Sequence, residues 1–189
     1  MNNIKLFIGA PSFGKTTLLC EYYNKLVQTN RCCIIYNPCD EENDISNEVY
    51  EMYPDKIKIP KKITTEYLNK LEVDVILSDE TQNRTIEELS NLISYVDDTD
   101  KQLFLFGTLF DPHGHIIPSM QYLLEIGIPF ELIKRKCSKC GDEAFNTIHT
   151  DKKGKIIISP VNNTDDEYDD VIVCRKCYNK YLNKLKFNN

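Results

Sequence analysis

The sequence lacks the apolar run that a membrane span needs, and it lacks an excess of positive charge. Its longest apolar runs are short segments such as residues 103–106, far below the ~20 residues that cross a bilayer. Lysine and arginine number 23 against 29 aspartates and glutamates, which gives a net charge of -6, and only four of the 23 are arginine. That balance argues against a protein that coats a nucleic-acid backbone.

The N-terminal segment also lacks the pattern of a signal peptide. Gly9 interrupts its apolar residues, so neither a long apolar stretch nor a small-residue cleavage site follows. We therefore expect a cytoplasmic protein with no membrane partner, and nucleic acid is a disfavoured partner.

What the sequence does contain is an alternation of short apolar segments and amphipathic segments up to about residue 130. Continuous apolar strands separated by helices predict a parallel sheet that helices cover on both faces, the α/β class. The ranges 4–8, 32–36, 57–59, 73–77 and 103–106 are predicted strands, and 16–27, 44–53, 64–71 and 85–96 are predicted helices.

The first motif with chemistry is a complete GxxxxGK[ST] between the first predicted strand and the first predicted helix. Glycines let the backbone wrap around phosphate oxygens, a lysine reaches the β- and γ-phosphates, and a hydroxyl holds Mg²⁺. A chance glycine-lysine turn is the alternative, but the strand-loop-helix setting disfavours it. The predicted ATP-binding residues are Gly9, Ala10, Pro11, Ser12, Phe13, Gly14, Lys15 and Thr16.

The second motif is the pair Asp79-Glu80 at the end of the predicted strand 73–77. Ligands of open α/β sheets gather at the carboxyl ends of the strands. Asp79 is therefore predicted to hold Mg²⁺ together with Thr16, and Glu80 could accept a proton from an attacking hydroxyl. A strand-end turn or a helix N-cap is the alternative interpretation of this aspartate.

The third motif is a pair of CxxC sequences formed by four of the eight cysteines. Two CxxC turns can close a tetrahedral zinc site, and two disulfides or a redox CxxC are the alternatives. The 33 residues between the two pairs predict a projecting loop that the metal ties at its base. The predicted zinc ligands are Cys137, Cys140, Cys174 and Cys177, whereas Cys20, Cys32, Cys33 and Cys39 are predicted to be buried thiols.

Taken together, these motifs resemble the type II thymidine kinases over nearly the whole chain. The resemblance is carried by the phosphate loop at Gly9, the run Asp79-Glu80-Thr81-Gln82, Gly107-Thr108 after the next strand, and CxxC with Cys174-Arg175-Lys176-Cys177-Tyr178. It implies a P-loop NTPase-type domain (residues 1–132) and a small zinc-bound lasso domain (residues 133–189). It also implies a tetramer that transfers the ATP γ-phosphate to the 5′-hydroxyl of thymidine.

The resemblance implies roles for individual residues as well. Glu80 is then the general base, Asp79 lies on the magnesium side, and Gln82 belongs to the ATP site. Ile157, Ile158 and Tyr168 would hold the nucleoside in the lasso, largely through main-chain groups.

The departures from the family pattern fall on residues that face the nucleoside. Where the family has an aspartate before the glycine after the fourth strand, this chain has Phe106, and an arginine expected a few residues later falls near Asp111. Asp40 is followed by two glutamates where the family has an Asp-x-Arg. Ser159-Pro160 replaces a Gly-Gly, and Tyr168 lies six residues before Cys174 where four are usual. The nucleotide and zinc residues are kept.

Four functions therefore compete. The sequence favours a deoxynucleoside kinase with thymidine as its substrate, followed by a kinase for a related nucleoside. A nucleotide-binding regulatory protein with weak or no catalysis is the main alternative, and Glu80 argues against it. A zinc-ribbon nucleic-acid binder is disfavoured by the negative net charge. A missing arginine can cost on the order of 10³ in the rate of phosphoryl transfer, so slow turnover is expected.

Overall fold

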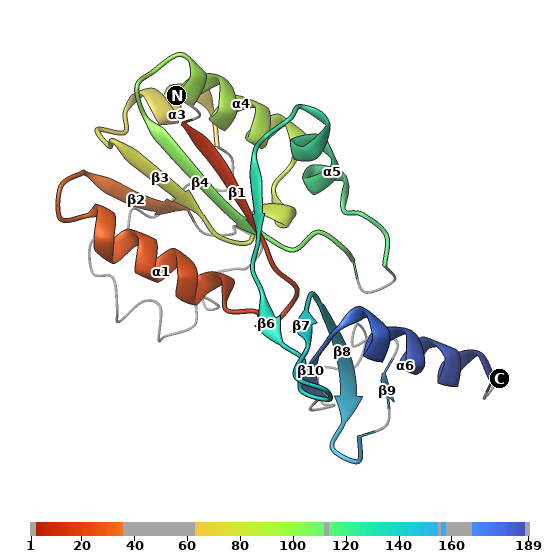
Figure 1. The fold of residues 1–189 in the computed structure, drawn as a ribbon. Coiled ribbons are helices and arrows are strands. Elements are labelled where there is room, and N and C mark those ends of the chain that lie inside the picture. Colours follow the sequence, from red (N-terminus) through yellow and green to blue (C-terminus); the bar gives the residue numbers. More distant parts are fainter. Residues whose placement is uncertain (1–2, 36–62, 112–113, 155, 158–167, 188–189) are drawn as a thin grey trace.

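The N-terminal part of the chain forms a five-stranded, fully parallel sheet, as the alternating pattern predicts (Figure 1). The computed structural model describes residues 3–35, 63–111, 114–154, 156–157 and 168–187. The strand order is β2-β3-β4-β1-β5. The strands are β1 (Ile4–Ile8), β2 (Cys32–Ile35), β3 (Val75–Ser78), β4 (Gln102–Gly107) and β5 (Phe130–Leu132).

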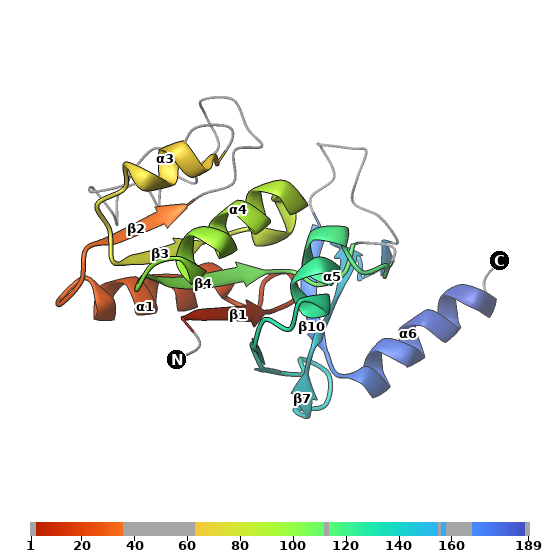
Figure 2. The ribbon, with the colours of Figure 1, turned by 90° about the horizontal axis from the view of Figure 1, so that it is seen from above.

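Helices cover both faces of this sheet, and β1 shows why (Figure 2). Its side chains alternate: Leu6 and Ile8 pack in one apolar cluster with α3, α4 and α5, while Phe7 packs in a second cluster with α1. A strand that is buried on both faces needs a nearly continuous apolar sequence, and in β1 only Lys5 is polar. The helices are α1 (Lys15–Leu26), α3 (Thr65–Asn69), α4 (Ile86–Asp97) and α5 (Pro118–Glu125).

The predicted elements 16–27 and 85–96 are helices in the structure, within a residue of their predicted ends. The start of α4 is encoded locally, since the Thr85 hydroxyl accepts from the Glu88 N–H and the Glu88 carboxylate accepts from the Thr85 N–H. The predicted helix 64–71 is shorter, and β3 begins two residues later than predicted, just after Asp74, which accepts a hydrogen bond from the Arg31 N–H. The predicted helix 44–53 and strand 57–59 lie outside the described residues.

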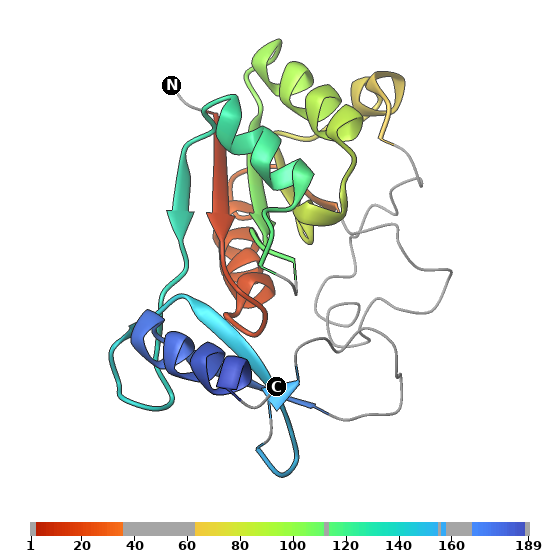
Figure 3. The same ribbon diagram turned by 90° about the vertical axis from the view of Figure 1, so that its right-hand side faces the viewer.

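The C-terminal unit, defined here as β6 to β10 with α6, lies beyond the carboxyl ends of β1 and β5 (Figure 3). It contains a three-stranded sheet of order β10-β8-β9 and a separate β6-β7 pair. The predicted boundary at residue 132 falls between β5 and β6. The elements are β6 (Arg135–Lys136), β7 (Glu143–Ala144), β8 (Asn146–Asp151), β9 (Ile156–Ile157), β10 (Tyr168–Val173) and α6 (Arg175–Phe187).

None of the helices in the described part of the chain is both long enough and apolar enough to cross a bilayer.

Candidate nucleotide and metal sites

The phosphate loop runs from the end of β1 to the start of α1, and its backbone is tightly curved. Gly14, the residue before α1, has a left-handed backbone with φ 77°, and Ser12 has φ 63°. At Gly9 an added Cβ would lie 3.2 Å from the side chains of Lys15 and Phe13, so a larger residue would press on both. The curvature and the close packing explain why glycines stand at both ends of the loop.

Lys15 begins α1 and turns its side chain back across the loop. Its Nζ lies 3.2 Å from the Ala10 carbonyl oxygen, and the side chain is almost fully buried. Burial lowers the pKa of Lys15, while the negative charges of Glu80, Asp79 and Asp170 oppose that shift. An ammonium group held inside the loop is placed to bind phosphate oxygens.

Thr16 and Asp79 are 63 residues apart in the sequence and touch in the structure. The Thr16 hydroxyl donates to Asp79 Oδ2 over 2.9 Å. Burial and the neighbouring Glu80 charge raise the pKa of Asp79, although the Thr16 hydroxyl, the Glu80 N–H and Lys15 act against the rise. A hydroxyl and a carboxylate are ligands that Mg²⁺ prefers, directly or through water, so these residues fit the predicted magnesium site.

Glu80 follows Asp79 in an unusual backbone conformation. Its φ is 46°, in the left-handed region that non-glycine residues seldom adopt. Gln82 holds the segment: its side-chain amide donates to Glu80 Oε2, and its Oε1 accepts from the Thr108 N–H over 3.0 Å. Such strain persists only where the surroundings impose it, and it is typical of functional sites.

A cavity of about 1110 Å³ lies against the phosphate loop and Glu80. It is lined by the phosphate loop, by Glu80 and Gln82, by residues that follow β4, and by β8 of the C-terminal unit. Its volume lies at the upper end of the range for ligand pockets, roughly 300–1,000 Å³, and leaves room for a ligand of nucleotide size.

The predicted lasso residues differ in their position relative to the cavity. Tyr168 does not line the cavity, but its ring packs edge-on against His149, which does, with the centroids 5.3 Å apart. Ile157 lies on β9 opposite His149 in the strand register. Ile158 lies outside the described residues, as do Asp40 and Ser159-Pro160.

Several cavity residues were not predicted from the sequence. The rings of Phe110 and Phe145 line the cavity and are 49% and 39% exposed, so they offer apolar surface to a ligand. Phe110 could have been noticed because it follows Gly107-Thr108, whereas no local signal marks Phe145. Phe106, where the family carries an aspartate, is fully buried and stacks on Phe7, with the ring centroids 4.9 Å apart. It therefore fills the core.

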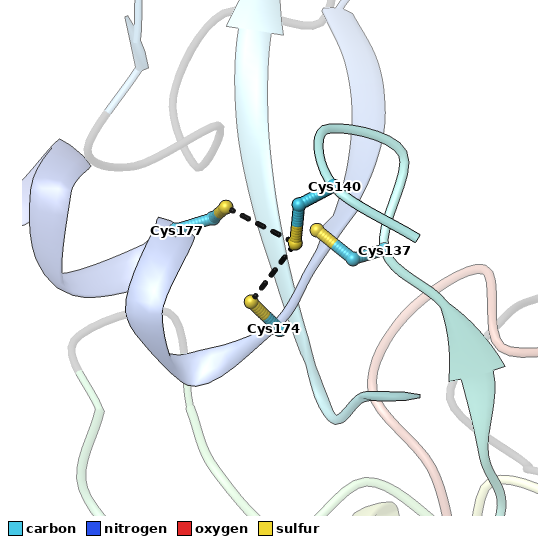
Figure 4. A group of neighbouring side chains, drawn as sticks. All are labelled: Cys137, Cys140, Cys174 and Cys177. Atoms are coloured by element: carbon cyan, nitrogen blue, oxygen red, sulfur yellow. Dashed lines mark hydrogen bonds between the residues drawn. The ribbon is translucent and has the colours of Figure 1, made fainter. Parts of the chain in front are cut away.

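The four cysteines of the two CxxC motifs converge in the C-terminal unit (Figure 4). Their sulfur atoms all lie within 4.8 Å of one another, and Cys140 Sγ is 3.5 Å from Cys174 Sγ and 3.7 Å from Cys177 Sγ. A tetrahedron of thiolates with Zn–S bonds of ~2.3 Å has S–S edges of ~3.8 Å, so the cluster fits a structural zinc ion.

The thiols of this cluster differ in pKa. Despite a hydrogen bond from the Asp142 backbone, hydrogen bonds with Cys137 and Cys174 raise the pKa of Cys140 to about 12, and burial raises that of Cys177. Burial disfavours the Cys137 thiolate, but hydrogen bonds from the backbone of Cys174, Lys139 and Cys140 outweigh it and lower the pKa of Cys137 to about 6. A thiol that loses its proton near neutral pH is a ready metal ligand.

The fold and the site together define a P-loop-type α/β protein with a four-cysteine cluster, compatible with a metal ion, at the carboxyl edge of its sheet. A family model described as thymidine kinase matches residues 2–178, and the chain belongs to that family. A thymidine kinase of Streptomyces coelicolor is 24% identical over 117 residues, which cover 58% of this chain and 54% of that protein. The match thus spans about half the length of this relative.

Proposed function

We propose that this protein transfers the γ-phosphoryl group of ATP to the 5′-hydroxyl of a deoxynucleoside, with thymidine or a close relative as the substrate. The observation that carries the proposal is the contact of Thr16 with Asp79, beside a cavity that Thr16 lines together with Lys15 and Glu80. Nucleotide binding alone would not require Glu80. Family membership supports the same conclusion.

Each of these residues has a separate role in phosphoryl transfer. Lys15 neutralises the β- and γ-phosphates, and Thr16 and Asp79 would hold Mg²⁺, which when bound offsets the charge on the phosphates. Glu80 would take the proton from the 5′-hydroxyl while the oxygen of that hydroxyl forms a bond to the γ-phosphorus. At the same time, the bond between the γ-phosphorus and the β-γ bridging oxygen breaks. ADP leaves with the electron pair of the broken bond.

Turnover is expected to be slow because positive charge is scarce in this site. Among the described residues that line the cavity, Lys15 is the one with a permanent positive charge. Phosphoryl transfer depends on neutralising the charge of the transferred group. The absence of the family's arginines should therefore lower the rate of transfer more than it weakens ATP binding. The homotetramer that the resemblance implies, and the cytoplasmic location expected from the N-terminal sequence, are part of this proposal.

The direct test incubates the protein with labelled ATP, Mg²⁺ and each natural deoxynucleoside in turn. We expect a labelled nucleoside 5′-monophosphate, most strongly with thymidine. If ATP binds but no nucleoside gives product above a blank without enzyme, the regulatory nucleotide-binding alternative is favoured.

Replacing Lys15 with alanine is expected to weaken ATP binding at least tenfold, since losing one partner of a buried charge pair costs about 2–5 kcal/mol. Calorimetric titration with ATP and Mg²⁺ measures the effect. Lys25→Ala is the matched control, because Lys25 is exposed in the last turn of the same helix. Equal affinities for wild type and Lys15→Ala would show that the loop does not hold the phosphates.

A further inference from the structure

The outer arc of the phosphate loop is held by the C-terminal unit. Three successive loop residues each bond to a different strand of that unit. Thr147 on β8 donates from its hydroxyl to the Pro11 carbonyl over 2.7 Å. The Ser12 hydroxyl donates to Asp170 on β10, and Nε of Arg135 on β6 donates to the Phe13 carbonyl over 2.9 Å.

The side chain of Phe13 strengthens this attachment. It is fully buried, and it packs in the apolar cluster of the C-terminal unit with Cys137, Ala144, Ile148, Val173 and Cys174. One residue of the phosphate loop is therefore part of the core around the cysteines. The conformation of the loop consequently depends on that unit as well as on β1 and α1.

Arg135 occupies a particular place in this arrangement. Besides its bond to Phe13, its guanidinium lies against Gly14, where an added Cβ would collide with Nη2. Arg135 does not line the cavity, so the guanidinium lies on the outside of the loop. Its charge is nevertheless only one residue away from Lys15, and at such short range a positive charge raises the affinity for an anion.

We propose that Arg135 is a positioning residue of the nucleotide site, which holds Phe13 and Gly14 in the phosphate-binding conformation and adds positive charge from outside the loop. Thr147 supports the same loop at Pro11. A loop that is ordered before ATP arrives binds more tightly, because its ordering cost is met during folding. The inference rests on the proposed function only in assuming that ATP binds this loop.

The test measures ATP–Mg²⁺ affinity by calorimetry without nucleoside, in four variants. Arg135→Gln should weaken binding at least about tenfold, because it removes a charged hydrogen-bond donor as well as the charge. Arg135→Lys should lose about threefold, since lysine keeps the charge but lacks the planar fork. Thr147→Val should also lose about threefold through its single neutral hydrogen bond. Lys136→Gln, with the same charge change on the neighbouring residue in β6, should stay within about twofold of wild type, because it removes only an exposed charge.

Melting temperature and zinc content, measured on the same samples, separate positioning from general damage. The expected pattern is weaker ATP binding with both properties near wild type. If wild type binds ATP and Arg135→Gln binds it within twofold of wild type, the inference is overturned while the proposed function stands. If Arg135→Gln and Lys136→Gln weaken binding equally, only general charge is acting and the positioning role is overturned. A wild-type protein that does not bind ATP overturns both proposals.

Discussion

Glu80→Gln is expected to lower the rate of nucleoside phosphorylation by at least about 10², because a positioned general base typically contributes 10²–10⁴. The substitution keeps the shape of the side chain and removes its ability to accept a proton. ATP affinity should stay near wild type, since Lys15, Thr16 and Asp79 remain in place. The rate falls without a matching change in binding, which is the signature of an interaction needed in the transition state.

The measurement is single-turnover transfer from labelled ATP, with calorimetry for ATP affinity on the same preparations. Glu21→Gln in α1 is the matched control, because it makes the same change at an exposed site on another element. Gln82 donates its amide to Glu80, and the amide oxygen that the substitution introduces can accept the same hydrogen bond, so a melting curve should show the fold unchanged. A variant that phosphorylates thymidine at the wild-type rate would assign the proton transfer to a different group.

Removing the metal is expected to have the largest effect on stability. Structural zinc in small domains is worth an apparent 10–16 kcal/mol at neutral pH, so Cys137→Ser should lose bound zinc and unfold the C-terminal unit. Cys137 and Cys174 are each 4% exposed, and they share an apolar cluster with Phe13 of the phosphate loop. ATP affinity should therefore fall along with zinc content, although neither cysteine lines the cavity.

Metal analysis of purified protein should give one equivalent of zinc per chain for wild type and well under one for Cys137→Ser. Cys32→Ser is the control, since Cys32 is a half-buried thiol on β2 outside the four-cysteine cluster. A full equivalent of zinc in Cys137→Ser, or an unchanged melting profile after zinc is lost, would contradict the prediction.

The elements that were predicted well are those whose sequence signals lie within a few neighbouring residues. The helix α4 has its capping box and its apolar stripe in one stretch, and β4 is one continuous apolar run. Some of the elements that were missed lack such local patterns, although α5, which was also missed, begins with the local signal of a proline at its first turn. The three residues of β5 are all exposed at the edge of the sheet, and β6 and β7 are only two residues long. Their pairing partners decide that they are strands.

The sequence by itself determined the types of chemistry: a phosphate loop at Gly9, a carboxylate pair after a buried strand, two CxxC turns, and membership of a recognisable family. These are patterns of residue type and short spacing, and they can be recognised without knowledge of the fold. Only the tertiary structure decided that Thr16 meets Asp79, that Phe13 packs beside the cysteines, and that Arg135 lies against the loop 122 residues before it. Contacts across such distances follow from the register of the sheet and the docking of the C-terminal unit, and no local periodicity encodes either of them.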